Sequence, residues 1–273
     1  MRGMCKPADC HESPPTLAAE CWACLRMAWP LALANLVDRS SLWITWALVG
    51  QEGGPAHLGP ASLASTVNNV LGVSVTIGLS LAVSTLASQA SGAQDYAALG
   101  RVLQRAIPIG ACFCIPVMLL LLLLEPLLLL LGRPADFAHT AGKYALCILP
   151  VAVLTGMQRS MLSWLSSLQI TKPILVINLV ILPLHAGLCY ALVFCTPLGY
   201  LGGGIATTLQ ALLRAALTYG YIRSSPRCAH AWSGFCWREM MSGWREYLKL
   251  ALPGAPRGPS LTAAAPGDVR LLF

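Results

Sequence analysis

Several runs of about 20 almost uncharged residues follow one another along this chain, and they constrain its fold more than any other feature. A run of this length is what an α-helix needs to cross the hydrocarbon core of a bilayer. Charged residues make up 11% of the sequence, against roughly 25% in an average soluble protein. Apolar residues make up 56%, more than a soluble core could bury in this order. The sequence therefore predicts an all-α polytopic membrane helix bundle.

Six membrane-spanning helices are predicted between residues 28 and 222, which form one transmembrane unit. Prolines, glycines and short polar stretches separate the apolar runs. The connection within Thr85–Arg105 turns abruptly small and polar, which is typical of a tight helix-to-helix turn at a membrane surface. The expected spans are about 29–50, 61–87, 107–131, 144–168, 174–194 and 198–222.

Lys and Arg are distributed unevenly between the two sides of these spans. Cytoplasmic connections are enriched in Lys and Arg, so the richer side, which includes the N-terminus, is predicted to be cytoplasmic. The membrane is expected to be the plasma membrane or an organelle membrane. The richer side holds Arg2, Lys6, Arg26, Arg101, Arg105, Lys172, Arg223, Arg227, Arg238, Arg245 and Lys249, and the other side holds Arg133 and Lys143.

Three further segments flank the predicted spans. Residues 1–27 are polar and are expected to form a cytoplasmic tail. Residues 223–255 combine tryptophans with basic residues, which is typical of a helix in the headgroup layer, and they end in the start of a seventh helix. Residues 256–273 contain three prolines and no apolar run, so they are expected to be disordered.

The second and third predicted spans and their connection contain three motifs: NVLGVSVTIGLS (69–80), SQASGAQ (88–94) and LGRVLQRA (99–106). Together they resemble the second and third transmembrane helices of the multidrug and toxic compound extrusion (MATE) transporters. Further matches are Pro30 and the motifs LGYLGGGIA and WREYLKLALP, so that the resemblance covers about residues 28–255. It implies the N-terminal lobe of a transporter with two six-helix lobes around a central cavity.

The resemblance implies a secondary antiporter that exports organic cations or drugs and is driven by protons or sodium ions. Protons are favoured as the coupling ion, and no cofactor is expected. The acidic residue that eukaryotic members carry on helix seven has no counterpart here, so the chain resembles a truncated form. The alternative is an isolated lobe, from splicing or a gene-model fragment, that transports nothing and at most associates with other membrane proteins. If the single lobe is functional, a homodimer could rebuild the two-lobed cavity. No nucleic-acid partner is expected, because the basic residues lie in short loops rather than along one face.

Asp38 is the candidate for a proton-coupling carboxylate. It lies about nine residues into the first span, where a charged side chain costs roughly 2.5–3.5 kcal/mol on insertion scales. Such residues usually face a cavity or a partner. The alternative is a structural pair with Asn69, His185 or Arg159.

Other polar residues within the spans are candidates for the substrate cavity, although each of them could instead bond a neighbouring helix. The polar and basic residues between the second and third spans are assigned to the turn and to the topology. The cavity candidates are Asn35, Asn69, Gln158, His185 and Tyr190, and the turn and topology residues are Gln89, Gly92, Arg101 and Arg105.

Motifs of enzymes and metal sites do not emerge from the sequence. It has no nucleophile elbow, no zinc-protease motif and no phosphate-binding loop, so no catalytic residue is assigned. One cluster has ligand-like spacing: Cys5, Cys10 and His11 precede the pair Cys21 and Cys24. No second pair follows it, so no metal site is predicted.

Overall fold

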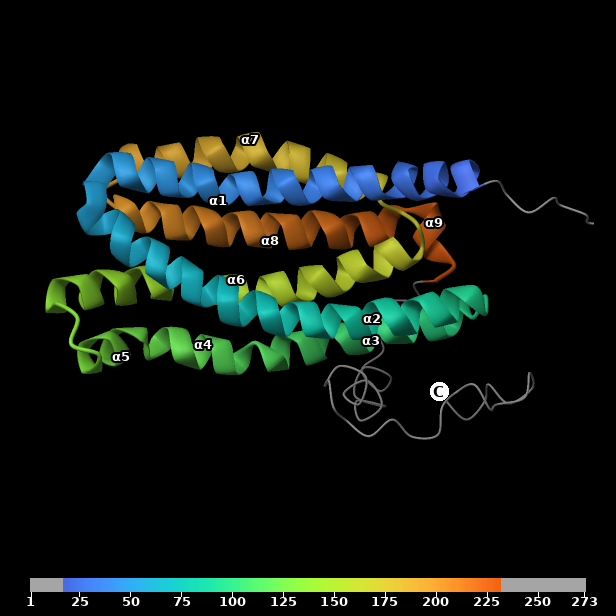
Figure 1. Ribbon diagram of the computed structural model, residues 1–273, viewed down its shortest axis with the longest axis horizontal. Helices are drawn as coiled ribbons and strands as arrows, with labels where there is room; N and C mark the ends of the chain where they lie inside the picture. Colours follow the sequence, from blue (N-terminus) through green and yellow to red (C-terminus); the bar gives the residue numbers. More distant parts are fainter. Residues whose placement is uncertain (1–16, 232–273) are drawn as a thin grey trace, which may run out of the picture.

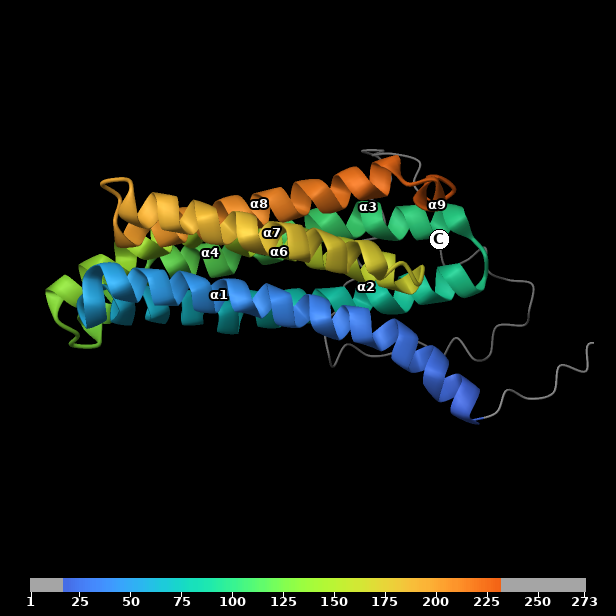
Figure 2. The ribbon, with the colours of Figure 1, turned by 90° about the horizontal axis from the view of Figure 1, so that it is seen from above.

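The computed structural model describes residues 17–231, which form a bundle of long helices (Figure 1). No strand occurs among these described residues, so the predicted all-α fold is confirmed. Figure 2 shows that the first turns of α1 diverge from the bundle, whereas the rest of α1 packs along it. The helices are α1 Leu17–Val67, η1 Asn68–Val73, α2 Ser74–Gly92, α3 Tyr96–Phe113, α4 Ile115–Leu122, α5 Leu124–Leu130, α6 Ala135–Ser167, α7 Lys172–Phe194, α8 Tyr200–Ser224 and α9 Pro226–Ala229.

The first two predicted spans form one helical path that folds back on itself at Gly54. Gly54 has φ 56° and ψ −155°, a conformation that residues with a side chain rarely adopt. Pro55 follows, at a position where a helix tolerates a missing N–H. The two arms run in opposite directions, blue and cyan in Figure 1. The predicted connection at residues 51–60 is therefore too long, because helix continues on both sides of Gly54.

A short turn joins α2 to α3, as the polar stretch between the second and third spans predicts. Gln94 turns the chain with φ 56°, a left-handed conformation. Asp95 then caps α3, because its side chain accepts a hydrogen bond from the backbone N–H of Ala98 at 2.9 Å.

Four helical stretches of the described residues are long and apolar enough to cross a membrane. The first of them folds back at Gly54, so it contains both of the first two predicted spans. α8, the predicted sixth span, is not among them, because its glycines and polar side chains make it less apolar. The count of six spans therefore stays a prediction. The four stretches are Ala28–Gly92, Tyr96–Leu122, Ala135–Ser167 and Lys172–Phe194.

Two apolar clusters occupy the two ends of the bundle. One joins α2, α3, the end of α6 and the start of α7, and the Trp164 Nε1–H donates to the Leu99 carbonyl within it at 2.9 Å. The other joins α4, α5 and the first half of α6. Along α6, Ala152 belongs to the second cluster and Met161 to the first. The polar residues Thr155, Gln158 and Arg159 of α6 therefore fall between two apolar layers.

The glycine run of α8 allows this helix to approach its neighbours closely. A Cβ at Gly202 would lie 2.4 Å from the Leu192 carbonyl oxygen on α7. A Cβ at Gly203 would lie 2.6 Å from Val49 Cγ2 on α1. Neither distance leaves room for a methyl group, so only glycine permits this packing.

Four predictions concern residues that the structure does not describe. The start of the seventh helix, the disordered tail and most of the segment predicted to lie in the headgroup layer (223–255) fall within residues 232–273. Residues 223–231 of that segment are described, and they contain the end of α8 and the short helix α9. Most of the predicted cytoplasmic tail falls within residues 1–16.

Candidate functional site

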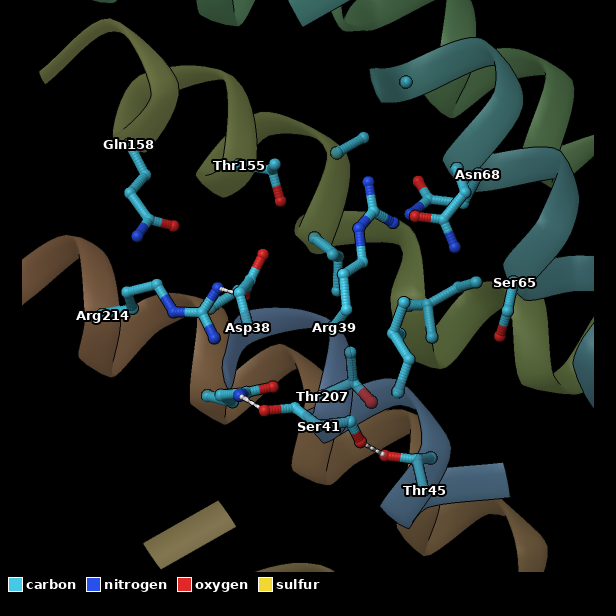
Figure 3. A pocket seen from close by; sticks show the side chains of 18 of the residues that line it. Asp38, Arg39, Ser41, Thr45, Ser65, Asn68, Thr155, Gln158, Thr207 and Arg214 are labelled. Carbon is cyan, nitrogen blue, oxygen red and sulfur yellow. Dashed lines mark hydrogen bonds and ion pairs between the residues drawn. The ribbon is translucent and has the colours of Figure 1, made fainter. Parts of the chain in front are cut away.

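A polar cavity lies in the middle of the bundle, between the two arms of α1, η1, α6 and α8 (Figure 3). Its volume is about 100 Å³, whereas pockets for drug-sized ligands have roughly 300–1,000 Å³. The described residues therefore enclose only part of the space that such a ligand needs. The polar and charged lining is Asp38, Arg39, Ser41, Thr45, Ser65, Asn68, Asn69, Tyr144, Thr155, Gln158, Arg159, Thr207, Gln210 and Arg214.

An ion pair between Asp38 on α1 and Arg214 on α8 lies at one side of this cavity (Figure 3). The Arg214 Nη1–H donates to Asp38 Oδ1. The side chains are only 27% and 12% exposed. Among the partners considered for Asp38 from the sequence, neither Asn69, His185 nor Arg159 takes this place.

One face of α1 carries the polar groups that bond to α8 and α7. Ser41 lies one turn beyond the ion pair, and its Oγ accepts from Gln210 Nε2 at 2.7 Å. Thr45 lies another turn along, and its Oγ1 is 2.9 Å from His185 Nε2. Residues three and four positions apart share a face of a helix, so Asp38, Ser41 and Thr45 form a row.

The π-helix η1 brings the asparagines of the second arm to the opposite side of the cavity. Asn68 and Asn69 lie at its start, and Gly72 completes this part of the lining. π-Helical turns are rare in proteins, and those that occur are often found at functional sites. The Arg39 side chain extends across the cavity toward Asn68 (Figure 3).

Three of the residues that the sequence proposed for the site line this cavity together. They are Asp38, Asn69 and Gln158. His185 is almost fully buried and lies outside the cavity, behind Thr45. Its hydrogen bond to Thr45 connects it to the lining.

The other two cavity candidates lie elsewhere. Asn35 is exposed, and its amide donates to the Leu31 carbonyl of its own helix. Tyr190 is 56% exposed, and its ring packs on Phe194 at 5.1 Å between centroids. Both therefore face away from the cavity, because each lies on the outer side of its helix.

The turn and topology candidates gather at the end of the bundle where α2 meets α3. Gln89 and Gly92 lie in the last turns of α2, and both are exposed. Arg101 and Arg105 lie in the first turns of α3, and both are half-buried. None of the four lines the cavity.

Sequence reasoning assigned no role in the cavity to most of its polar and charged lining, including Arg39, Asn68 and Arg214. Arg39 and Arg214 are charged side chains within predicted spans. Because such residues are costly in a membrane, their presence alone could have indicated a cavity or a partner. Asn68 is adjacent to a residue that was assigned. Their common direction depends on how α1, η1 and α8 pack, which the spacing within one span does not reveal.

Comparison with known proteins identifies a protein family to which this chain is similar. The family model described as MatE matches residues 30–191. Protein DETOXIFICATION 12 of Arabidopsis thaliana is 33% identical over 226 residues, which are 83% of this chain and 47% of that protein. Protein DETOXIFICATION 10 of the same plant is 31% identical over 240 residues, which are 88% of this chain and 49% of that protein. The chain spans about half the length of these relatives.

Solved structures share the arrangement of the helices. The crystal structure of the eukaryotic MATE transporter AtDTX14 is similar with a TM-score of 0.74 and 27% identity, over 83% of this chain and 53% of that one. The Vibrio cholerae MATE transporter VcmN in the bent form has a TM-score of 0.69 and 24% identity, over 83% and 50%. The second likeness shows the fold alone.

Proposed function

Because this chain belongs to the family of multidrug and toxic compound extrusion (MATE) transporters, we propose that it acts as the N-terminal lobe of a secondary antiporter that exchanges organic compounds for protons. The family consists of transporters, and no enzymatic activity is proposed. Since the chain spans about half of its relatives, exchange, coupling ion and substrate are proposals. The observation that carries them is the Asp38–Arg214 pair, an ionisable carboxylate in a polar cavity between apolar layers.

The proposed coupling step is the making and breaking of this ion pair. When Asp38 is ionised, it pairs with Arg214 and holds α1 against α8. When Asp38 takes up a proton, it becomes neutral and its attraction to the guanidinium group falls. A proton therefore shifts the balance between two arrangements of the helices, which coupling requires. Protonation is proposed to favour release of the substrate outward.

The neighbouring hydrogen bonds keep the helices in contact while the ion pair breaks. The Ser41–Gln210 and Thr45–His185 bonds need no charge on Asp38. They join α1 to α8 and to α7, respectively. The proposed movement is therefore a local change around Asp38 rather than a separation of the helices.

The distribution of charge supports a cytoplasmic N-terminus. The α2–α3 turn, the α6–α7 turn and α9 lie at the same end of the bundle (Figure 1). Arg101, Lys172 and Arg227 lie at this end, and cytoplasmic ends are enriched in such residues. The opposite end carries Arg133 and Lys143. The specific membrane, plasma membrane or organelle, stays a prediction from the sequence.

Transport in proteoliposomes tests the proposed function. A pH gradient should drive a fluorescent drug-like compound, as the family resemblance implies, across the membrane faster than in protein-free liposomes. Asp38→Asn should remove the part of the flux that depends on the gradient. Unchanged gradient-driven flux in Asp38→Asn would exclude Asp38 as the coupling carboxylate.

A second candidate is a lobe that transports nothing by itself, and the small volume of the cavity favours it. Two copies could line a larger cavity, since two lobes related by an axis along the membrane normal can share one orientation. Crosslinking in liposomes separates these cases. A crosslinked dimer that transports supports a homodimer, whereas monomers without transport support the non-transporting lobe.

A further inference from the structure

The charged residues that line the cavity are mainly positive, which does not suit the binding of an organic cation. Its charged lining consists of Asp38, Arg39, Arg159 and Arg214, so that its formal net charge is +2. Charges within membrane helices are costly and are usually paired. An excess of two positive charges among these lining residues therefore points to a ligand of the opposite sign.

Two of the three arginines make no hydrogen bond or ion pair in the described part of the chain. Arg214 is paired with Asp38. Arg159 is half-buried and feels the charge of Asp38, but no hydrogen bond or ion pair holds it within residues 17–231. Arg39 extends across the cavity and likewise makes no such contact with the described residues (Figure 3). One carboxylate cannot neutralise three guanidinium groups.

The hydrogen-bonding groups of the lining show the same imbalance. Trp46 Nε1 and Arg214 Nε are buried donors without an acceptor in the described structure. Indole and guanidinium nitrogens can only donate, so these groups need an oxygen from elsewhere. Asn68 Oδ1 is a buried acceptor without a donor, but its two lone pairs cannot serve these two groups and the guanidinium N–H groups of Arg39 and Arg159 as well. The cavity therefore has a surplus of donors.

We propose that this cavity binds the anionic group of an organic solute, a carboxylate or a sulfonate, with Arg39 and Arg159 as its main contacts. The planar guanidinium group matches such oxyanions with two parallel hydrogen bonds. The inference rests on the proposed function, because it names the substrate class of the same site. It replaces simple organic cations with organic anions and with zwitterions that carry an acidic group.

Binding to the full chain in lipid nanodiscs tests this inference without any gradient. The probes are radiolabelled p-aminohippurate, an aromatic carboxylate, and tetraethylammonium, a simple organic cation. Hippurate should bind saturably, and tetraethylammonium should not compete with it. Arg39→Gln and Arg159→Gln should each weaken hippurate binding by about 10-fold or more, as expected for a lost charge-assisted hydrogen bond.

Matched variants separate a specific contact from a general effect of charge. Arg133→Gln removes an exposed arginine outside the cavity, where it lies over the Phe137 ring, and should leave hippurate binding unchanged. Arg159→Lys keeps the charge but loses the planar guanidinium group, which can donate two parallel hydrogen bonds. This variant should bind hippurate with intermediate affinity. Asp38→Asn removes the one carboxylate among the lining residues and should strengthen hippurate binding.

Two results would overturn the inference: tetraethylammonium binding without hippurate binding, or wild-type hippurate affinity in both glutamine variants. Arg39 is exposed, so Arg39→Gln decides the question if Arg159→Gln does not fold. Failure of the proposed function has a different outcome. Hippurate binding without gradient-driven transport would contradict the transport proposal and leave the anion site standing.

Discussion

Asp38 and Arg214 form an ion pair between α1 and α8, although 176 positions separate them in the chain. Both side chains are largely shielded from solvent. Removing one member of such a pair leaves the other charge uncompensated, which costs more than removing both. The pair is thus a direct probe of the packing of α1 on α8.

Replacing Asp38 alone should destabilise the protein more than replacing both partners. Asp38→Ala should lower the free energy of unfolding by about 1–3 kcal/mol, because it leaves the Arg214 guanidinium without its acceptor. The double variant Asp38→Ala/Arg214→Leu should recover part of this loss. Thermal unfolding in detergent measures both. A double variant less stable than Asp38→Ala would contradict the pairing.

A methyl group at Gly202 should disrupt the contact of α8 with α7. Gly202→Ala would place Cβ 2.4 Å from the Leu192 carbonyl oxygen, and backbone cannot move aside as a side chain can. We expect a loss of about 1–3 kcal/mol in unfolding free energy. Gly220→Ala is the control on the same helix, since nothing lies within 4 Å of its added Cβ. Equal melting temperatures for the two variants would refute the close approach.

The cap of α3 should depend on the side-chain oxygen of Asp95. Asp95→Ala removes the acceptor for the Ala98 N–H and should cost about 1 kcal/mol. Asp95→Asn keeps an oxygen at the same place and should retain most of the stability. Melting curves of the two variants in one detergent provide the comparison. If Asn were no better than Ala, the hydrogen bond would not account for the turn.

The proposed orientation predicts which cysteines an impermeant maleimide reaches in intact cells. Cys195 is exposed between α7 and α8, at the proposed outer end, and should be labelled from outside. In a background without other cysteines, Ala93→Cys in the α2–α3 turn should be labelled only after permeabilisation. The reverse pattern would invert the topology.

Local sequence features were sufficient for the fold class and for part of the site. Apolar runs predict membrane helices because each helix satisfies its own backbone and needs only apolar side chains. The small polar residues within Thr85–Arg105 predicted the turn between α2 and α3, whereas the cap of α3 by Asp95 is a finding of the structure. Asp38, Asn69 and Gln158 stood out because polar groups inside apolar runs face a cavity or a partner.

The relation between helices was decided by the tertiary structure. The sequence offered Asn69, His185 and Arg159 as partners of Asp38, but packing of α8 against α1 selects Arg214. The same packing leaves His185 behind Thr45. Hydropathy, capping and turn signals act over a few residues, whereas the direction of a side chain across a bundle depends on the rotation and depth of every helix around it. The sequence by itself therefore determined that this chain forms membrane helices with polar residues inside them, and only their packing determined which of those residues meet.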